Sequence, residues 1–345
     1  MAKLPQSVKV ACYSILERLN LFFAILAPAI IQHFNLTINY LGIFFCLQEG
    51  CKSLSEHMTR WMVQKFTFYY TVALGIALRI IAFTMCANCS SKSAFLLTAV
   101  MYGVSRSMAS SKLEAFLITH GNHNNSSNKT SQTFSLRYIS SNVGATLSGL
   151  IAALILKSLS IAAVFYAAST ITGMQLIFFL LFWSETKITQ SNPSKAKQWR
   201  FSLQVYWLQL IMAFFVIVCK SMYKISIAQN VNAQYFVFIY SAVQFSTIVV
   251  PMSIMLLPAN IKRLIVPTGF IVMVLSLAMY AARFTYGYLF LLVFAAIYPS
   301  IRGEVAKLIV TSGDSQAKTM QKITNTESMT SLLSAIFYMM VFVFG

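Results

Sequence analysis

The sequence predicts an all-α, polytopic membrane protein. Of its 345 residues, 58% are apolar and only 10% are charged, against roughly 25% charged residues in an ordinary soluble domain. A soluble protein of this size would need more charged residues to cover its surface. The same composition excludes collagen-like, disordered, disulfide-scaffold and nucleic-acid-binding proteins. The remaining class is a chain that crosses a lipid bilayer several times.

Eleven apolar runs are long enough to be membrane spans, since a span needs about 20 apolar residues. The runs are too long for strands of a β-barrel and show no alternation of apolar and polar residues, so each is predicted to be a helix. The predicted spans are residues 8–31, 38–58, 67–87, 94–118, 136–157, 161–183, 203–223, 234–257, 264–282, 286–309 and 327–345.

The distribution of basic residues orients these spans. The chain carries 26 Lys and Arg against 8 Asp and Glu, a net charge of +18. With the N-terminus inside the cell, the inner segments and the adjoining span ends hold sixteen of the basic residues, and the outer segments and their adjoining span ends hold five. Cytoplasmic loops of membrane proteins carry such an excess. We therefore expect a cytoplasmic N-terminus, no nucleic-acid partner, and a location in a cell membrane, with a bacterial inner membrane as the favoured one.

The clearest linker comes after the sixth predicted span. Residues 184–202 are charged, contain Pro193 and hold no apolar run, a composition typical of a connection between folded units. This linker divides the chain into a six-helix bundle at 1–183 and a five-helix bundle at 203–345. Two helical halves joined by a basic inner loop form the layout of many secondary transporters.

Two local features resemble the major facilitator superfamily. After its second span, that family carries a Gly-x-x-x-Asp-Arg-x-Gly-Arg signature. Residues 52–60 (KSLSEHMTR) match it in part, with Glu56 in place of the acid and Arg60 as the closing base. Residues 102–115 (YGVSRSMASSKLEA) are similar to the fourth helix of drug-exporter-like members, where a Gly-Arg-rich turn leads to small residues and then Glu-Ala.

The resemblance implies two helical bundles that alternate in facing the two sides of the membrane. It implies gating roles for Glu56, Arg60 and Glu114, because charges in these loops and helix ends hold the inward side closed in the family. The family usually has twelve spans, so the second bundle is expected to lack a twelfth. Two alternatives are a transport-inactive or truncated homologue that acts as a membrane assembly partner, and an uptake permease of the same fold.

Ionisable residues inside the predicted spans gather in the first half of the chain. Such a residue costs about 2.5–3.5 kcal/mol at the centre of a span, so it usually faces a partner or a water-filled cavity. Glu17 and Glu49 are the predicted proton-binding carboxylates, and Arg18 is predicted to be the partner of Glu17 or a substrate contact. The alternative for Glu17 and Arg18 is a purely structural ion pair.

Further residues are predicted to line a substrate cavity. Arg79 could pair with Glu49 or Glu114, and within the fourth span Arg106 is a better cavity candidate than Glu114. The second half contributes polar and aromatic candidates, Gln209 and Tyr240. An apolar, aromatic cavity of this kind suits small amphipathic organic compounds better than sugars.

The fourth predicted span has two ordered strips. Arg106, Ser110 and Glu114 recur every four residues, which places them along one face of a regular helix. The adjacent strip consists of small residues that would let a neighbouring helix approach closely, namely Gly103, Ser107 and Ser111.

Metal, cofactor and enzymatic chemistry are not predicted. His120 and His123 lie in a polar inner loop without a cluster of cysteines or carboxylates, so a metal site is not expected. The sequence has no Walker A motif for ATP and no potassium-channel selectivity filter. The sequence therefore predicts a monomeric, proton-coupled secondary transporter that exports small amphipathic organic compounds by alternating access.

Overall fold

The computed structural model describes residues 5–19, 27–111, 127–183, 233–262, 264–281 and 316–344, and all elements within them are helices. The helices of the first half are α1 (Gln6–Leu19), α3 (Ala27–Phe34), α4 (Ile38–Lys65), α5 (Phe68–Asn88), α6 (Lys92–Arg106), the π-helical turn η1 (Ser107–Ser111), α8 (Ser127–Ser158) and α9 (Ile161–Phe182). The later helices are α11 (Ala233–Met255), α12 (Ala259–Lys262), α13 (Ile265–Ala281) and α15 (Gln316–Phe344).

These helices match the predicted spans with three extensions. Helix α4 continues to Lys65, α8 begins at Ser127 and α15 begins at Gln316, beyond the predicted limits of 58, 136 and 327. Residues 59–65, 127–135 and 316–326 contain no Gly or Pro, so nothing in them terminates a helix where the apolar run ends. The predicted spans 203–223 and 286–309 lie outside the described residues.

Three helices of the first half begin at a hydroxyl-bearing residue after a short turn. The side chain of Thr37 accepts a hydrogen bond from the Tyr40 amide at the start of α4. At the start of α6, the Ser91 hydroxyl accepts from the Ala94 amide at 3.2 Å. At the start of α9, the Ser160 hydroxyl accepts from the Ala163 amide at 3.4 Å. Each contact satisfies an amide that has no partner within its own helix, so the short connections fix where each span starts.

Large apolar side chains cover the outside of several helices. Within the described ranges, three helical segments are long and apolar enough to cross a membrane: Phe68–Asn88, Ile139–Ser158 and Ile161–Phe182. Exposed leucines, isoleucines and aromatics on α5, α8, α9 and α13 include Leu154, Leu180 and Ile271. Such an exterior is expected where lipid replaces water as the solvent, so the chain is a multi-pass membrane protein.

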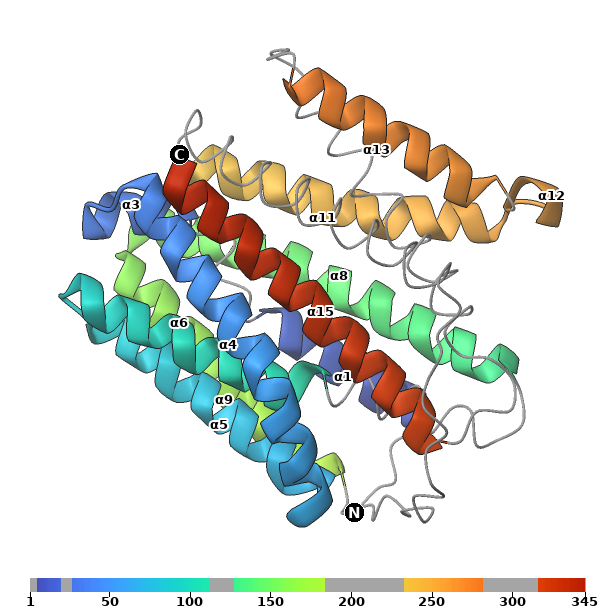
Figure 1. Cartoon of the computed structure of the whole chain (residues 1–345), viewed down its shortest axis with the longest axis horizontal. Helices are drawn as coiled ribbons and strands as arrows, with labels where there is room; N and C mark the ends of the chain where they lie inside the picture. Colours follow the sequence, from blue (N-terminus) through green and yellow to red (C-terminus); the bar gives the residue numbers. More distant parts are fainter. Residues whose placement is uncertain are drawn as a thin grey trace.

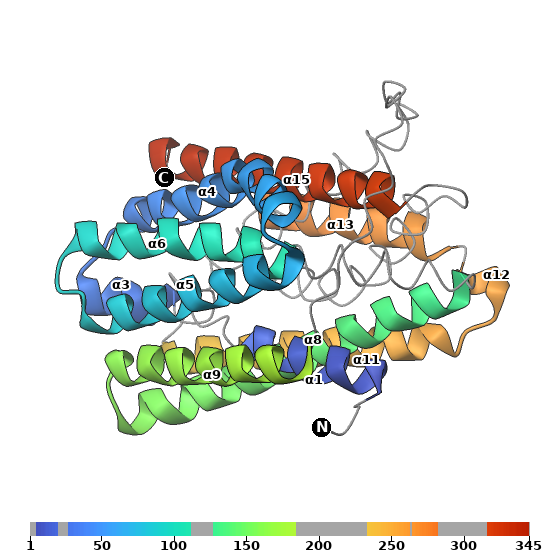
Figure 2. The same cartoon turned by 90° about the horizontal axis from the view of Figure 1, so that it is seen from below.

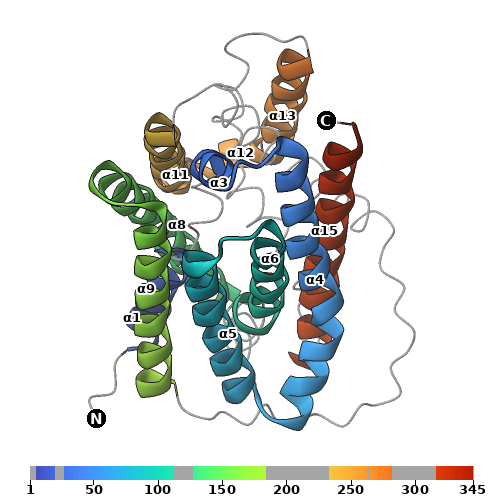
Figure 3. The same cartoon turned by 90° about the vertical axis from the view of Figure 1, so that its left-hand side faces the viewer.

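The axes of the long helices are roughly aligned (Figure 2). Two pairs of neighbouring helices connect the N-terminal part of the chain to the C-terminal part. Helix α15 lies along α4, and α11 lies along α8 (Figures 1 and 3). We call these the α4–α15 contact and the α8–α11 contact.

Small polar side chains make both of these contacts. In the α4–α15 contact, the Ser53 hydroxyl donates to the Ser328 carbonyl oxygen at 2.9 Å, and the two hydroxyls lie 3.1 Å apart. In the α8–α11 contact, the Asn142 amide donates to the Thr247 carbonyl at 3.4 Å. Hydroxyls and small residues at a helix interface let two backbones approach inside a membrane. The two halves therefore meet through these hydrogen bonds together with apolar contacts, such as that between the rings of Phe45 and Tyr338.

Two glycines fix the closest helix approaches within the first half. A Cβ atom on Gly103 of α6 would lie 2.3 Å from the Gln48 carbonyl oxygen of α4. A Cβ atom on Gly144 of α8 would lie 2.3 Å from the Ile15 carbonyl oxygen of α1. The prediction that small residues of the fourth span allow close approach is confirmed, and α1 is held against α8 by the same device.

Candidate functional site

A buried cluster of charges joins four elements of the first half. We call it the Glu17 cluster: Glu17 of α1, Arg79 of α5, Ser110 of η1 and Arg137 of α8. Arg137 donates from Nη2 to Glu17 Oε2 at 3.5 Å and to the Ser110 carbonyl oxygen at 3.5 Å. Glu17 is 6% exposed and Arg137 is 9% exposed, so this ion pair is held away from water between α1 and α8.

Arg137 was not among the predicted site residues, and it replaces Arg18 as the ion-pair partner of Glu17. The prediction of a Glu17–Arg18 pair is wrong because consecutive residues of a helix point about 100° apart, while Arg137 faces α1 directly. Arg18 remains half-buried and contributes a weaker positive charge to the surroundings of Glu17. The helical extension of α8 back to Ser127 carries Arg137 well inside a helix, which the absence of Gly and Pro in 127–136 could have signalled.

Arg79 is the most buried arginine of the described chain, at 2% exposure. Its Nε donates to the Ser105 hydroxyl at 3.1 Å and its Nη2 donates to the Ser110 hydroxyl at 3.0 Å. Its guanidinium lies 5.7 Å from the centre of the Tyr102 ring, within the range of a cation–π contact. Of the two partners that the sequence left open for Arg79, Glu49 binds Arg106 instead, and Glu114 lies outside the described residues.

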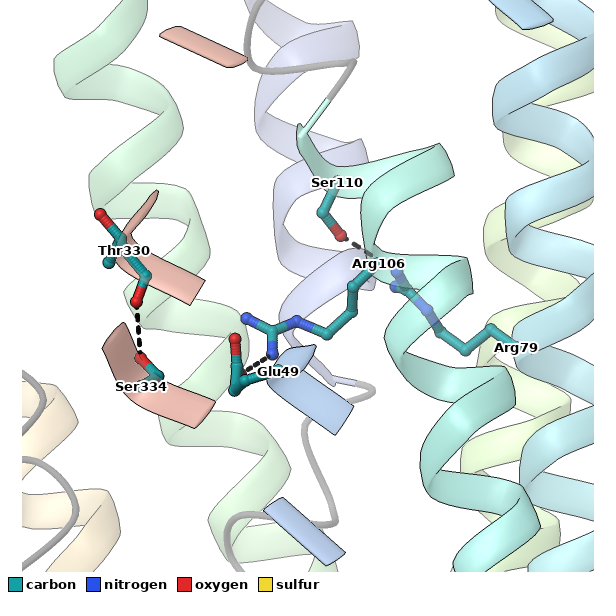
Figure 4. A network of polar contacts seen from close by, with 6 residues as sticks. All are labelled: Glu49, Arg79, Arg106, Ser110, Thr330 and Ser334. Atoms are coloured by element: carbon teal, nitrogen blue, oxygen red, sulfur yellow. Dashed lines mark hydrogen bonds and ion pairs between the residues drawn. The ribbon is translucent and has the colours of Figure 1, made fainter. Parts of the chain in front are cut away.

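A second group of charges lies where α4, α6 and α15 meet. We call it the Glu49 cluster: Glu49 of α4, Arg106 of α6 and Ser331 of α15. Arg106 Nη1 donates to Glu49 Oε1 in an ion pair (Figure 4). Ser331 hydrogen-bonds the same carboxylate, and Lys52 adds a nearby positive charge. The Glu49 carboxylate therefore bridges the first half of the chain to the second.

The π-helical turn η1 separates the two clusters. Figure 4 shows Arg106 extending toward Glu49, whereas Ser110 meets Arg79. The prediction that Arg106 and Ser110 serve one common face is wrong, because a π turn holds one more residue than an α turn and rotates the residues after it. Such turns are frequent at functional sites, and this one distributes the polar residues of the fourth span between two clusters.

The predicted gating residues Glu56 and Arg60 lie near the C-terminal end of α4. Glu56 is 0% exposed and Arg60 is half-buried, so Glu56 does not belong to a solvated charged face. Next to them, the Thr59 hydroxyl lies 3.0 Å from the hydroxyl of Ser107 at the start of η1. This hydrogen bond ties the signature-like segment of α4 to the end of the fourth span.

Three other predicted site residues have no described side chain. Glu114 and Gln209 lie outside the described residues. Tyr240 belongs to α11, but its side chain is outside the described part. The structure thus brings four of the predicted residues into the two clusters, namely Glu17, Arg79, Glu49 and Arg106, and adds Arg137, Ser110 and Ser331 to them.

No protein-family model matches this sequence, and no curated protein matches it either. Solved structures are similar in fold. The crystal structure of the nucleoside transporter NupG superposes with a TM-score of 0.67 at 13% identity, covering 99% of this chain and 92% of that chain. The human organic anion transporter MFSD10 (TETRAN) gives 0.65 at 14% identity, with 99% and 95% covered.

A third similar structure is that of a bacterial homologue of the human lysosomal transporter Spinster, in an inward-facing and occupied conformation. It gives a TM-score of 0.67 at 13% identity and covers 98% of this chain and 82% of that chain. These structures are major facilitator transporters. The chain therefore has the two-bundle, all-α fold of that superfamily, as the sequence predicts.

Proposed function

We propose that the chain is a proton-coupled secondary transporter that moves a small amphipathic organic compound by alternating access. The observation that carries this proposal is the Glu17 cluster, in which a carboxylate is buried among arginines of other helices. A membrane-embedded ionisable group is a candidate functional site because its burial is costly. The moving units would be residues 1–183 and 203–345, joined by the cytoplasmic linker 184–202, in a monomer.

The surroundings of Glu17 suit a group that gains and loses a proton. Burial opposes its charged form, whereas a neighbouring arginine favours it. The charged and titratable groups that face Glu17 are Arg137 from α8, Arg79 from α5, and Arg18 and Tyr13 from α1. Opposing influences of this kind allow a small rearrangement of α1 against α8 to decide whether the proton is bound.

The Glu49 cluster would transmit that change between the halves. Glu49 binds Arg106 within the first half and Ser331 of α15 in the second. Neutralising Glu49 weakens both contacts at once, which favours separation of α4 from α15. Glu56 and Arg60 would act as the inner gate next to the Thr59–Ser107 hydrogen bond.

The transported compound and its direction belong to the same proposal. The drug-exporter-like fourth span favours export, with Arg18, Arg106, Gln209 and Tyr240 as substrate contacts. The similar structures include a nucleoside transporter and an organic anion transporter, so the fold accommodates amphipathic organic substrates. An uptake permease remains the alternative; it would carry the compound in the same direction as the proton, whereas an exporter carries the two in opposite directions.

Membrane vesicles of both orientations test this function. Inside-out vesicles from cells that overproduce the chain, with an acidified lumen, would be incubated with a cell metabolite extract. We expect compounds to accumulate in the lumen, detected by mass spectrometry, and the accumulation to disappear when a protonophore collapses the pH gradient. Accumulation in right-side-out vesicles alone would identify an uptake permease. No accumulation in either orientation would contradict transport and favour an assembly partner.

The orientation of the chain is a separate prediction. We expect Ser194→Cys, in the linker, to resist a membrane-impermeant thiol reagent in intact cells, because the basic inner segments stay in the cytoplasm. The matched control is Ser90→Cys, an exposed position between α5 and α6, which should react. Both variants would be made after replacing the six native cysteines by serine. Labelling of Ser194→Cys with protection of Ser90→Cys would reverse the orientation.

A further inference from the structure

Arg79 differs from the other arginines of the two clusters. Arg106 and Arg137 each bind a carboxylate. Among the residues that the structure describes, no carboxylate lies within ion-pair distance of Arg79, whose hydrogen bonds go to two serine hydroxyls. A guanidinium has five N–H donors and no acceptor. Two serines and an aromatic ring leave most of that capacity unused.

The net charge around Arg79 also favours the binding of a further acceptor group, one that carries a negative charge. Glu17 is the carboxylate of the Glu17 cluster, and three guanidinium groups act on it, those of Arg137, Arg79 and Arg18. A buried charge without a counter-charge is strongly unfavourable. Within the described residues, the Glu17 cluster therefore carries an excess of positive charge that an added anion would neutralise.

Two serines flank the guanidinium. Ser105 and Ser110 come from α6 and η1 and accept from Nε and Nη2 of Arg79 respectively. The Ser110 hydroxyl also hydrogen-bonds the Glu17 carboxylate, so it holds the guanidinium in place, whereas the proton of the Ser105 hydroxyl is left to donate. The planar fork of an arginine matches the two oxygens of a carboxylate or phosphate, and Ser105 would add a donor beside it.

We propose that Arg79, held in place by Ser110 and assisted by Ser105, binds an anionic group of the transported compound, so that the substrate is an organic carboxylate or phosphate. This inference rests on the proposed transport function, because Arg79 is 2% exposed in this conformation. The site would become accessible only when the first half rearranges during the transport cycle. The apolar remainder of the substrate would pack against neighbouring helices of the spans.

Thermal unfolding of the purified full chain in a neutral detergent tests the substrate class. The probes are sets of aromatic and short-chain carboxylates, each with its isosteric amide and amine, such as benzoate, benzamide and benzylamine, together with phenyl phosphate. A ligand that binds the folded state raises Tm in proportion to its occupancy. We expect at least one carboxylate or phosphate to raise Tm well above its amide and amine counterparts. Equal effects within every set would overturn the inference.

Variants then locate the site. Arg79→Gln should lose the Tm increase, and Arg79→Lys should keep only part of it, because lysine keeps the charge but not the fork. Lys65→Gln is the matched control: it removes a positive charge from an exposed position, over the Trp61 ring, and should keep the full increase. If Arg79→Gln does not fold, the comparison of Arg79→Lys with Lys65→Gln decides. An unchanged increase in the folded Arg79 variants would place the anion elsewhere.

Two further comparisons distinguish a lipid headgroup from a small solute, and a failure of the anion site from a failure of the transport function. Adding phosphatidylglycerol to the detergent, with phosphatidylcholine as control, tests a lipid headgroup. An Arg79-dependent increase with this lipid alone would overturn the assignment to a small solute. Anion binding without vesicle accumulation would contradict the transport function and leave the site standing. Accumulation of a cationic or neutral compound without anion binding would contradict the site and leave the function standing.

Discussion

Replacing Glu17 by glutamine is expected to abolish uphill, pH-driven transport while exchange of labelled for unlabelled substrate continues. Glutamine keeps the size of the side chain and can still accept a hydrogen bond from Arg137, but it cannot bind and release a proton. Exchange at equal pH needs only the conformational cycle and the substrate site. Both activities would be measured in the same vesicles, with the compound identified by accumulation.

Glu49→Gln is the matched comparison, because Glu49 is, among the described residues, the second buried carboxylate with an arginine partner. If Glu17 is purely structural, its glutamine variant should instead lose yield and thermal stability. Arg137 would then lose its carboxylate partner, and a charged residue at the centre of a span costs about 2.5–3.5 kcal/mol. Full pH-driven transport by Glu17→Gln, with loss in Glu49→Gln, would move proton binding to Glu49.

Gly144→Ala is expected to cause the largest loss of folded protein. The added Cβ would lie 2.3 Å from the Ile15 carbonyl oxygen and 2.9 Å from its Cα atom. Backbone atoms cannot rotate away as a side chain can, so α1 and α8 must separate, and the Glu17–Arg137 contact would lengthen with them. Overpacking a tight interior costs about 1–3 kcal/mol, which should appear as a lower Tm and a smaller monodisperse peak in size-exclusion chromatography.

Gly173→Ala provides the control for helix propensity. Gly173 lies within α9, and no atom outside its own helix backbone lies within 4 Å of the position its Cβ would take. Alanine favours the helical conformation over glycine by about 0.5–1 kcal/mol, so this variant should be as stable as the natural chain or slightly more stable. An equal loss in both variants would show that the α1–α8 approach is not the cause.

The positions of the spans were predictable because length and hydropathy determine which segments can cross a membrane. The described spans begin or end within a few residues of the predicted limits, except where a polar helix continues beyond the apolar run. At Lys65, Ser127 and Gln316 the helix continues because hydropathy changes there while helix-forming tendency does not. Arg137, the partner of Glu17, lies just inside the predicted fifth span, but hydropathy does not indicate which acid it meets.

The pairing of charges was much less predictable. Glu49 and Arg106 are 57 positions apart, and Glu17 and Arg137 are 120 positions apart. Only the three-dimensional arrangement of the helices decides which arginine faces which acid. The π turn at Ser107–Ser111 adds a second obstacle, because the α-helical period assigns the residues after it to the wrong side. Sequence reasoning therefore found the acids and arginines but not most of their partners.

The hydrogen bonds between the two halves limit how their helices can slide along one another. In the α4–α15 and α8–α11 contacts, side chains donate to main-chain carbonyl oxygens, as Ser53 does to Ser328 and Asn142 does to Thr247. Successive carbonyl oxygens of a helix lie about 1.5 Å apart along its axis but point about 100° apart around it. On the side that faces the partner helix, a carbonyl oxygen therefore recurs about once per turn, roughly 5.4 Å further on. A donor that leaves one carbonyl can bond to the next only after such a step, so we expect sliding of these helices to pass between positions one turn apart.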